Sequence, residues 1–127
     1  MAYQTDFSTE EFRSRRNTVA EAIGDATALI VGAPTDNGSI PFRQYNDFYY
    51  LCGVEVPHAY LLIDGPTGKT TLYLPEMAHL VVDSDDPVLC ADDAAYVMKT
   101  TGVDAVAPRD QLEGALADVT TLYTFLR

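Results

Sequence analysis

Lysine is scarce in this sequence, which contains only Lys69 and Lys99, and acidic residues outnumber basic ones 19 to 8 for a formal net charge of −11. Because nucleic acid is bound by clustered Lys and Arg, this balance argues against a nucleic-acid-binding protein. The basic cluster Arg13, Arg15 and Arg16 lies among glutamates, and we interpret it as a solvated helix face. An acidic, lysine-poor surface is also typical of halophiles, so a salt-loving source is one hypothesis.

Cysteine is also rare, and long apolar runs are absent. Cys52 and Cys90 cannot build a disulfide framework, and their spacing matches no zinc motif. No run of residues is long and apolar enough to span a bilayer, and the first twelve residues lack the basic and apolar regions of a secretion signal. We therefore expect a cytoplasmic protein without a membrane partner. Cys52 has no basic neighbour in sequence to lower its pKa, so we expect a core thiol.

The 127 residues are expected to form a single domain with a core of its own. Its first helix has clear start and stop signals. Ser8 followed by Glu11 forms a capping box, and Phe7 and Phe12 are spaced as a hydrophobic staple. Apolar residues then recur at helical spacing up to Gly24, where we expect the helix to end.

The rest of the chain alternates between strands and helices. Strands are expected at 26–34, 58–64, 70–75, 103–107 and 120–126, and helices at 91–102 and from Pro108 to 118. The segment 35–39 is a predicted loop. The second and third strands bracket a turn and form a hairpin, so the sheet must mix directions. We predict an α/β fold with a mixed β-sheet flanked by helices.

The hairpin turn ends in Gly68-Lys69-Thr70, which imitates the end of a phosphate-binding loop. The imitation fails because the required first glycine would fall at Ile63, and because a strand-forming run follows where a helix must start. We interpret the segment as a turn.

No catalytic or metal-binding constellation is evident. His58 and His79 have no metal-ligand partner at helical or strand spacing, and we expect surface or partly buried side chains. The pair Asp85-Asp86 fits a turn and Asp92-Asp93 a helix start. A phosphoacceptor receiver domain would need an acidic pair after its first strand, where this chain has one Asp. The residues themselves predict a domain that performs no chemistry alone.

The most informative segment is "FRQYNDFYYLCGVEVPHAYLLID", residues 42–64, followed by "TGKTTLYLP", residues 67–75. It closely resembles the amino-terminal domain of Xaa-Pro aminopeptidases and prolidases, in the creatinase-like metallopeptidase family. Departures from the family pattern are Cys52, where Thr is usual, and Val54, where Phe is usual. The resemblance implies a ribonuclease H-like fold for residues 1–127, as the non-catalytic leading domain of a larger protein.

The resemblance also implies a parent enzyme that hydrolyses the bond between an N-terminal residue and proline. Its catalytic domain would follow this one and hold two divalent metal ions, expected to be manganese, while this chain holds no cofactor and is predicted to be inactive alone. In such proteins the leading domain builds a dimer or tetramer and lines the active-site cleft. The alternative is a non-catalytic protein-interaction module, because creatine-cleaving enzymes and histone-chaperone domains are similar.

The aromatic segment supplies the candidate site residues. By position, Tyr49 resembles the aromatic that reaches the cleft of a neighbouring subunit, while Phe48 and Tyr50 are expected to pack inward; Tyr50 remains a cleft or interface candidate. The other interpretation is that all these rings are core around a short helical turn capped by Asn46 or Asp47.

Arg43 is the remaining candidate. The resemblance implies contact with substrate or with carboxylates across an interface. An ion pair with Asp47 inside the domain explains the same residue equally well. No catalytic residue and no metal ligand is predicted in this chain.

Overall fold

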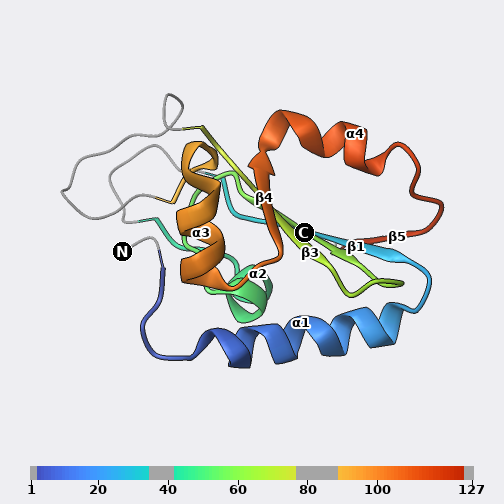
Figure 1. Cartoon of the computed structure of the whole chain (residues 1–127), viewed down its shortest axis with the longest axis horizontal. Helices are drawn as coiled ribbons and strands as arrows, with labels where there is room; N and C mark the ends of the chain where they lie inside the picture. The colour runs from blue at the N-terminus through green and yellow to red at the C-terminus, as the bar shows by residue number, and fades with distance from the viewer. Residues whose placement is uncertain (1–2, 35–41, 77–88, 125–127) are drawn as a thin grey trace.

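The computed structural model describes residues 3–34, 42–76 and 89–124. Their helices and strands, in chain order, are α1 Thr9–Ile23, β1 Thr27–Val31, α2 Asn46–Cys52, β2 Tyr60–Asp64, β3 Thr70–Leu74, the 3-10 turn η2 Ala91–Asp93, α3 Ala94–Thr101, β4 Ala105–Pro108, the 3-10 turn η3 Arg109–Gln111, α4 Leu112–Leu116 and β5 Leu122–Thr124. The strands form one sheet in the order β4-β3-β2-β1-β5 (Figure 1). No helix in these ranges is both long and apolar enough to cross a membrane.

The predicted mixed sheet is confirmed. β2 runs antiparallel to β3, as the hairpin requires, and also antiparallel to β1. β4 and β5, each of which follows a helix, join the two edges in parallel with β3 and β1. The hairpin turn is also confirmed, since Gly68 has φ 73° and donates its N–H to Asp64 O, and Thr70 begins β3. No helix follows it, so it is not a phosphate-binding loop.

The first helix begins as its sequence predicts. Ser8 is the N-cap, and its Oγ accepts a hydrogen bond of 3.2 Å from Glu11 N–H. The Phe7 and Phe12 rings meet edge to face with centroids 6.1 Å apart, which completes the staple. α1 ends at Gly24, whose φ of 62° suits a residue without Cβ.

Pro108 differs from the prediction, because it closes β4 in an extended conformation and precedes η3 instead of opening a helix.

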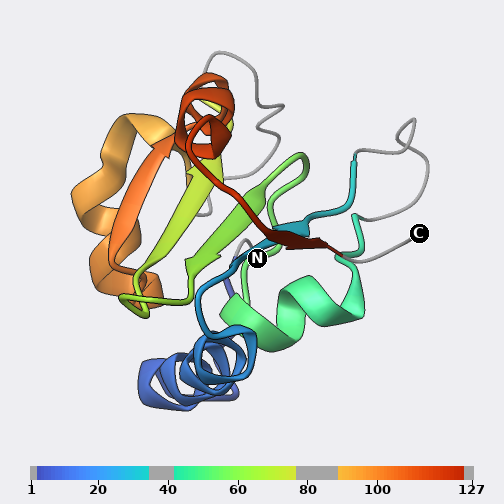
Figure 2. The same cartoon turned by 90° about the vertical axis from the view of Figure 1, so that its right-hand side faces the viewer.

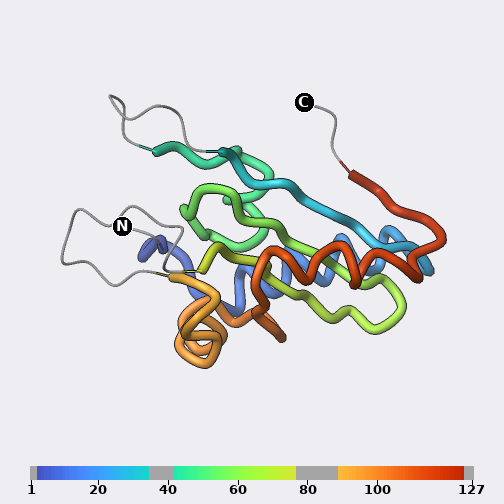
Figure 3. Tube along the Cα trace, turned by 90° about the horizontal axis from the view of Figure 1, so that it is seen from above, coloured from blue at the N-terminus to red at the C-terminus, as the bar shows by residue number. Residues whose placement is uncertain are grey.

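The hydrophobic core lies on one face of the sheet. Alternate strand residues point to this face, which we name the inner face, and α1, α2 and α3 cover it (Figures 1 and 2). The inner-face strand residues are Ala28, Ile30, Leu61, Ile63, Leu72 and Leu74. On the opposite side, the outer face, α4 crosses the strands (Figures 1 and 3). Within the described ranges, the inner face is therefore covered by three helices and the outer face by the short helix α4.

The prediction that the arginines of α1 form a solvated face is wrong for Arg15 and Arg16, whereas Arg13 is exposed as expected. Arg16 is only 3% exposed, and its guanidinium donates to Leu51 O at 3.0 Å and to Gly102 O at 3.3 Å. Arg13, although exposed, also donates to Gly102 O, at 2.7 Å. These carbonyls lie at the C-terminal ends of α2 and α3, where backbone acceptors lack helical partners and carry partial negative charge. The arginines fasten both helix ends to α1.

Candidate functional site

The aromatic segment forms α2, a helix of seven residues that lies between α1 and the end of β1. Its N-cap is Tyr45, with no side-chain cap, so the predicted capping by Asn46 or Asp47 is wrong. Asp47 instead accepts a hydrogen bond from Phe48 N–H in the first turn. Gly53 ends the helix in the left-handed conformation, φ 70°, and donates its N–H to Tyr49 O. The two ends hold the α2 side chains in fixed directions.

Gln44 anchors this segment, and the sequence analysis missed its role. The side chain is buried, and its Oε1 accepts from the N–H groups of Ala33 and Tyr45 at 2.7 and 3.1 Å. Its Nε2 donates to Val54 O and Val56 O at 3.1 and 3.3 Å. One amide thus joins the end of β1 to the chain on both sides of α2. The signal was the glutamine itself, in a run of aromatics where a buried amide needs several partners.

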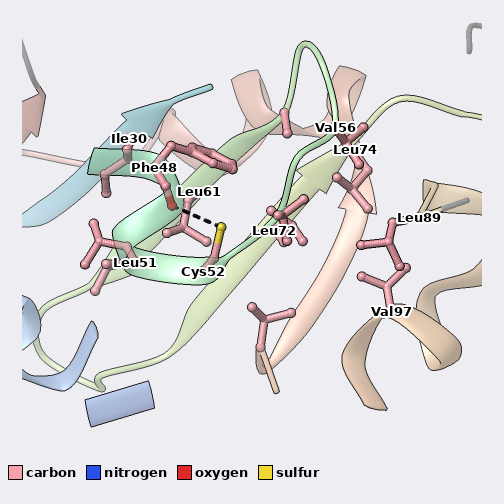
Figure 4. Close-up of a cluster of buried hydrophobic side chains, with 14 of the residues drawn as sticks. Ile30, Phe48, Leu51, Cys52, Val56, Leu61, Leu72, Leu74, Leu89 and Val97 are labelled. Atoms are coloured by element: carbon pink, nitrogen blue, oxygen red, sulfur yellow. Dashed lines mark hydrogen bonds between the residues drawn. The ribbon is translucent and has the colours of Figure 1, made fainter. Parts of the chain in front are cut away.

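The inward side of α2 is core. Phe48 is fully buried, as predicted, and Cys52 lies beside it with its Sγ 3.4 Å from Phe48 O (Figure 4). Burial raises the pKa of the Cys52 thiol to about 12. A thiol that stays protonated at neutral pH is a poor nucleophile, in agreement with the expected core role.

Tyr50 does not pack inward, which corrects the prediction. Its side chain is 55% exposed, and its ring lies 4.3 Å from the guanidinium carbon of Arg15. Arg15 also donates to Tyr50 O at 3.0 Å and faces the rings of Phe7 and Phe12 at 4.9 and 5.0 Å. Arg15 therefore holds the Tyr50 ring at the surface, where cation–π attraction stabilises it in place of burial in the core.

Tyr49 and Arg43 do lie together. They line a hollow of about 330 Å³ whose other residues are Gln44, Asn46 and Glu55. Tyr49 is partly buried, and its pKa is raised by that burial and then by the negative charges of Glu55 and Asp6. Arg43 is exposed.

Arg43 does not pair with Asp47. Among the described residues, the ion pairs join Arg13 to Asp104 and Arg15 to Glu11. The Arg43 side chain therefore forms no ion pair with any other described residue, and it lines the hollow. The predicted candidates Arg43 and Tyr49 share one surface, and Tyr50 lies on another, next to α1.

The described lining of the hollow is polar and includes no Ser, Thr, Cys or Lys side chain. Its side chains supply a guanidinium, a phenol, two amides and a carboxylate, which suit a polar chain end or backbone. No three metal-ligating side chains cluster within residues 3–34, 42–76 and 89–124. His58 is partly buried, as expected, and its backbone N–H donates to Ala33 O. The predictions for His79, for Asp85-Asp86 and for the loop 35–39 fall outside the described residues.

A mixed-sheet α/β domain with α1, α2 and α3 on one face, α4 on the other and a polar hollow beside α2 is thus the class that the fold and site define. Residues 12–124 match the family described as aminopeptidase P, N-terminal domain. The chain belongs to this family, and the resemblance seen in its sequence is confirmed.

Relatives in sequence and in structure agree with this assignment. A probable Xaa-Pro aminopeptidase of Phaeosphaeria nodorum is 48% identical over 40 residues, which cover 32% of this chain and 9% of that protein. One from Aspergillus flavus is 42% identical over 65 residues, 46% of this chain and 13% of its own length. Escherichia coli aminopeptidase P with the inhibitor Pro-Leu has a TM-score of 0.73 at 24% identity, over 94% of this chain.

The matched region is a minor part of these relatives. This chain spans 29% of the length of the solved Escherichia coli chain, whose likeness shows the fold. The shares of the two fungal proteins are smaller still.

Proposed function

We propose that this chain is the oligomerisation and active-site-gating domain of an Xaa-Pro aminopeptidase. The observation that supports it is the hollow in which Arg43, Tyr49 and Glu55 meet on the buried support of Gln44 and Phe48. Family membership supports the reaction class that we propose for the parent protein, hydrolysis of the bond between an N-terminal residue and proline. The parent would be a dimer or tetramer, and its substrate a proline-containing peptide.

In this proposal the chain binds and orients, and the catalytic domain breaks the bond. Two divalent metal ions, which we expect to be manganese, would be held in the catalytic domain, where they supply an activated water. The described residues of this chain do not fit a metal pair, since they contain no cluster of three ligands. Tyr49 contributes a large, rigid ring to the cleft, Arg43 a cation for a carboxylate or carbonyl, and Glu55 an acceptor for an ammonium group.

The test compares this chain alone with the chain expressed together with the coding region that follows it. We expect the longer polypeptide to hydrolyse an Xaa-Pro peptide in the presence of manganese, and the 127 residues alone to be inactive. In the longer polypeptide, Tyr49→Ala should raise KM about tenfold, equal to about 1.4 kcal/mol of binding, with a smaller change in kcat. Tyr96→Ala, at a residue of α3 that is 38% exposed, is the matched control and should change neither.

A stability measurement separates a gating role from a structural one. Phe48→Ala should lower the free energy of unfolding by about 3–5 kcal/mol because it leaves a cavity at a fully buried site. Tyr49→Ala, at a partly buried site, should lower it by well under half of that. If Tyr49→Ala leaves KM and the oligomer unchanged, or if the isolated chain cleaves the peptide, the proposal is wrong. A longer polypeptide that binds partners but cleaves nothing would favour the alternative, an interaction module of a creatinase-like relative.

A further inference from the structure

The outer face of the sheet is more apolar than a solvated face. Leu29 of β1 lies beside Leu62 of β2, and Val31 beside Tyr60, in the register of the antiparallel pair. All four side chains point to the side opposite the core and are partly exposed. A sheet face that meets water usually carries polar residues at such positions. These two rows of apolar side chains indicate that another surface covers them.

The helix α4 covers only part of this face. Tyr73, on β3, is only 5% exposed, whereas the four outer-face side chains of β1 and β2 named above are partly exposed. α4 has five residues, and its Leu112 and Leu116 are themselves partly exposed. Together with Tyr60 they line a hollow of about 470 Å³. We name this hollow the outer-face groove.

The groove also carries a buried donor and an acidic rim. Arg109 lies with its guanidinium carbon 5.8 Å from the centre of the Tyr60 ring, and its Nε is buried with no hydrogen-bond partner in the part of the chain that the structure describes. The remaining polar residues of the groove are Glu76, Asp110 and Glu113. Buried donors are normally satisfied, so the orphan Nε is a second sign that the surface is incomplete. A suitable occupant brings an apolar side chain, a hydrogen-bond acceptor and a nearby positive charge.

We propose that the outer-face groove is the docking surface for the catalytic domain of the same polypeptide, which would insert an apolar side chain flanked by a basic residue. This inference rests on the proposed function. Since this chain spans 29% of the solved aminopeptidase P chain, most of a protein of that length lies outside this domain. A second copy of this chain fits poorly, because it brings a net charge of −11 toward an acidic rim.

Tethering makes such a contact effective despite its small size. A domain joined by a short linker experiences a millimolar local concentration, so one anchored side chain with a few polar contacts can hold it in place. The cleft contact proposed for Tyr49 uses a separate surface, because no described residue lines both the Tyr49 hollow and the outer-face groove.

Hydrogen–deuterium exchange tests the proposal, with the chain alone and with the longer polypeptide. The amides of α4 and β2 should exchange at least tenfold more slowly in the longer polypeptide, while those of α1 stay unchanged. Leu116→Asp should restore fast exchange of α4, and Tyr96→Asp on α3 should not. Glu113→Arg, at an exposed position of α4, is the second variant and should also weaken the protection by repelling the basic residue.

Two results would overturn the proposal. One is equal α4 exchange in both polypeptides; the other is α4 protection in the chain alone that rises with protein concentration, which would assign the groove to a second copy. Activity on the Xaa-Pro peptide separates this failure from that of the proposed function. If the longer polypeptide cleaves the peptide but α4 exchanges as fast as in the chain alone, the proposed function is supported and the docking surface is wrong. If α4 is protected but no peptide is cleaved, the docking surface is supported and the proposed function is wrong.

Discussion

Arg16 shows how one buried charge can organise three helices. Its guanidinium lies in the interior and links α1 to Leu51 O of α2 and to Gly102 O beyond α3. Burial lowers the pKa of the Arg16 guanidinium, although arginine is the side chain that keeps its proton most firmly in proteins. The cation is tolerated because it meets two carbonyl groups at the negative ends of helices.

Replacing Arg16 by methionine should therefore destabilise the fold by about 2–3 kcal/mol, because Leu51 O loses its donor and stays buried. Arg13→Met is the matched control, since that side chain is 54% exposed and shares the acceptor Gly102 O with Arg16. We expect it to cost less than about 1 kcal/mol. Urea denaturation monitored by circular dichroism measures both. If both variants lose the same free energy of unfolding, the buried hydrogen bonds of Arg16 contribute no more to stability than the exposed one of Arg13.

At the scale of single elements, local signals and long-range contacts differ in how well the sequence predicts them. The start of α1 is predictable because Ser8, Glu11, Phe7 and Phe12 act within one turn. The hairpin and the mixed sheet follow from alternation and turn residues in the same way.

Partners far apart in sequence are not predictable from such signals. Arg15 was interpreted as solvated because its neighbours in sequence are charged, but its ring partner Tyr50 is 35 residues away. The same contact turned Tyr50 outward. Tyr49 and Arg43 were identified through family resemblance, whereas the support by Gln44 depends on four backbone groups that meet only in the folded chain.

The end of α2 provides a test of how tightly an element boundary is packed. Gly53 and Gly68 both have positive φ, 70° and 73°. A Cβ at Gly53 would lie 2.8 Å from Phe12 Cζ, while one at Gly68 meets nothing within 4 Å. Gly68→Ala should cost only the backbone strain of the left-handed conformation, about 1–2 kcal/mol. Gly53→Ala should lower the free energy of unfolding by about 1–2 kcal/mol more than Gly68→Ala, because the added Cβ also overpacks the core. Thermal unfolding compares them, and similar costs would mean that Phe12 moves aside freely.

At the scale of the whole molecule, charge is the dominant feature. The chain carries 19 acidic and 8 basic residues, and three of the basic ones are used to fasten α2 and α3 to α1. The remaining surface repels itself, which opposes compaction while it keeps molecules apart. A contact with a second, equally acidic subunit must form against this field, whereas the basic residue proposed for the catalytic domain would be attracted by it.

Salt should therefore stabilise the folded chain. Raising sodium chloride from about 0.01 M to 0.1 M shortens the Debye length from about 30 Å to about 10 Å, which screens repulsion across the whole domain. We expect the melting temperature to rise by roughly 5 °C over this interval, and to rise less between about 0.1 M and 1 M because most of the repulsion is already screened. The exposed Arg13–Asp104 pair, at 4.0 Å, weakens in salt but contributes too little to reverse the trend.

Sucrose, which strengthens burial without screening charge, is the control and should not reproduce the steep low-salt rise. A melting temperature that is flat at low salt would show that the acidic surface does not limit stability, and would remove the physical basis for a halophilic source.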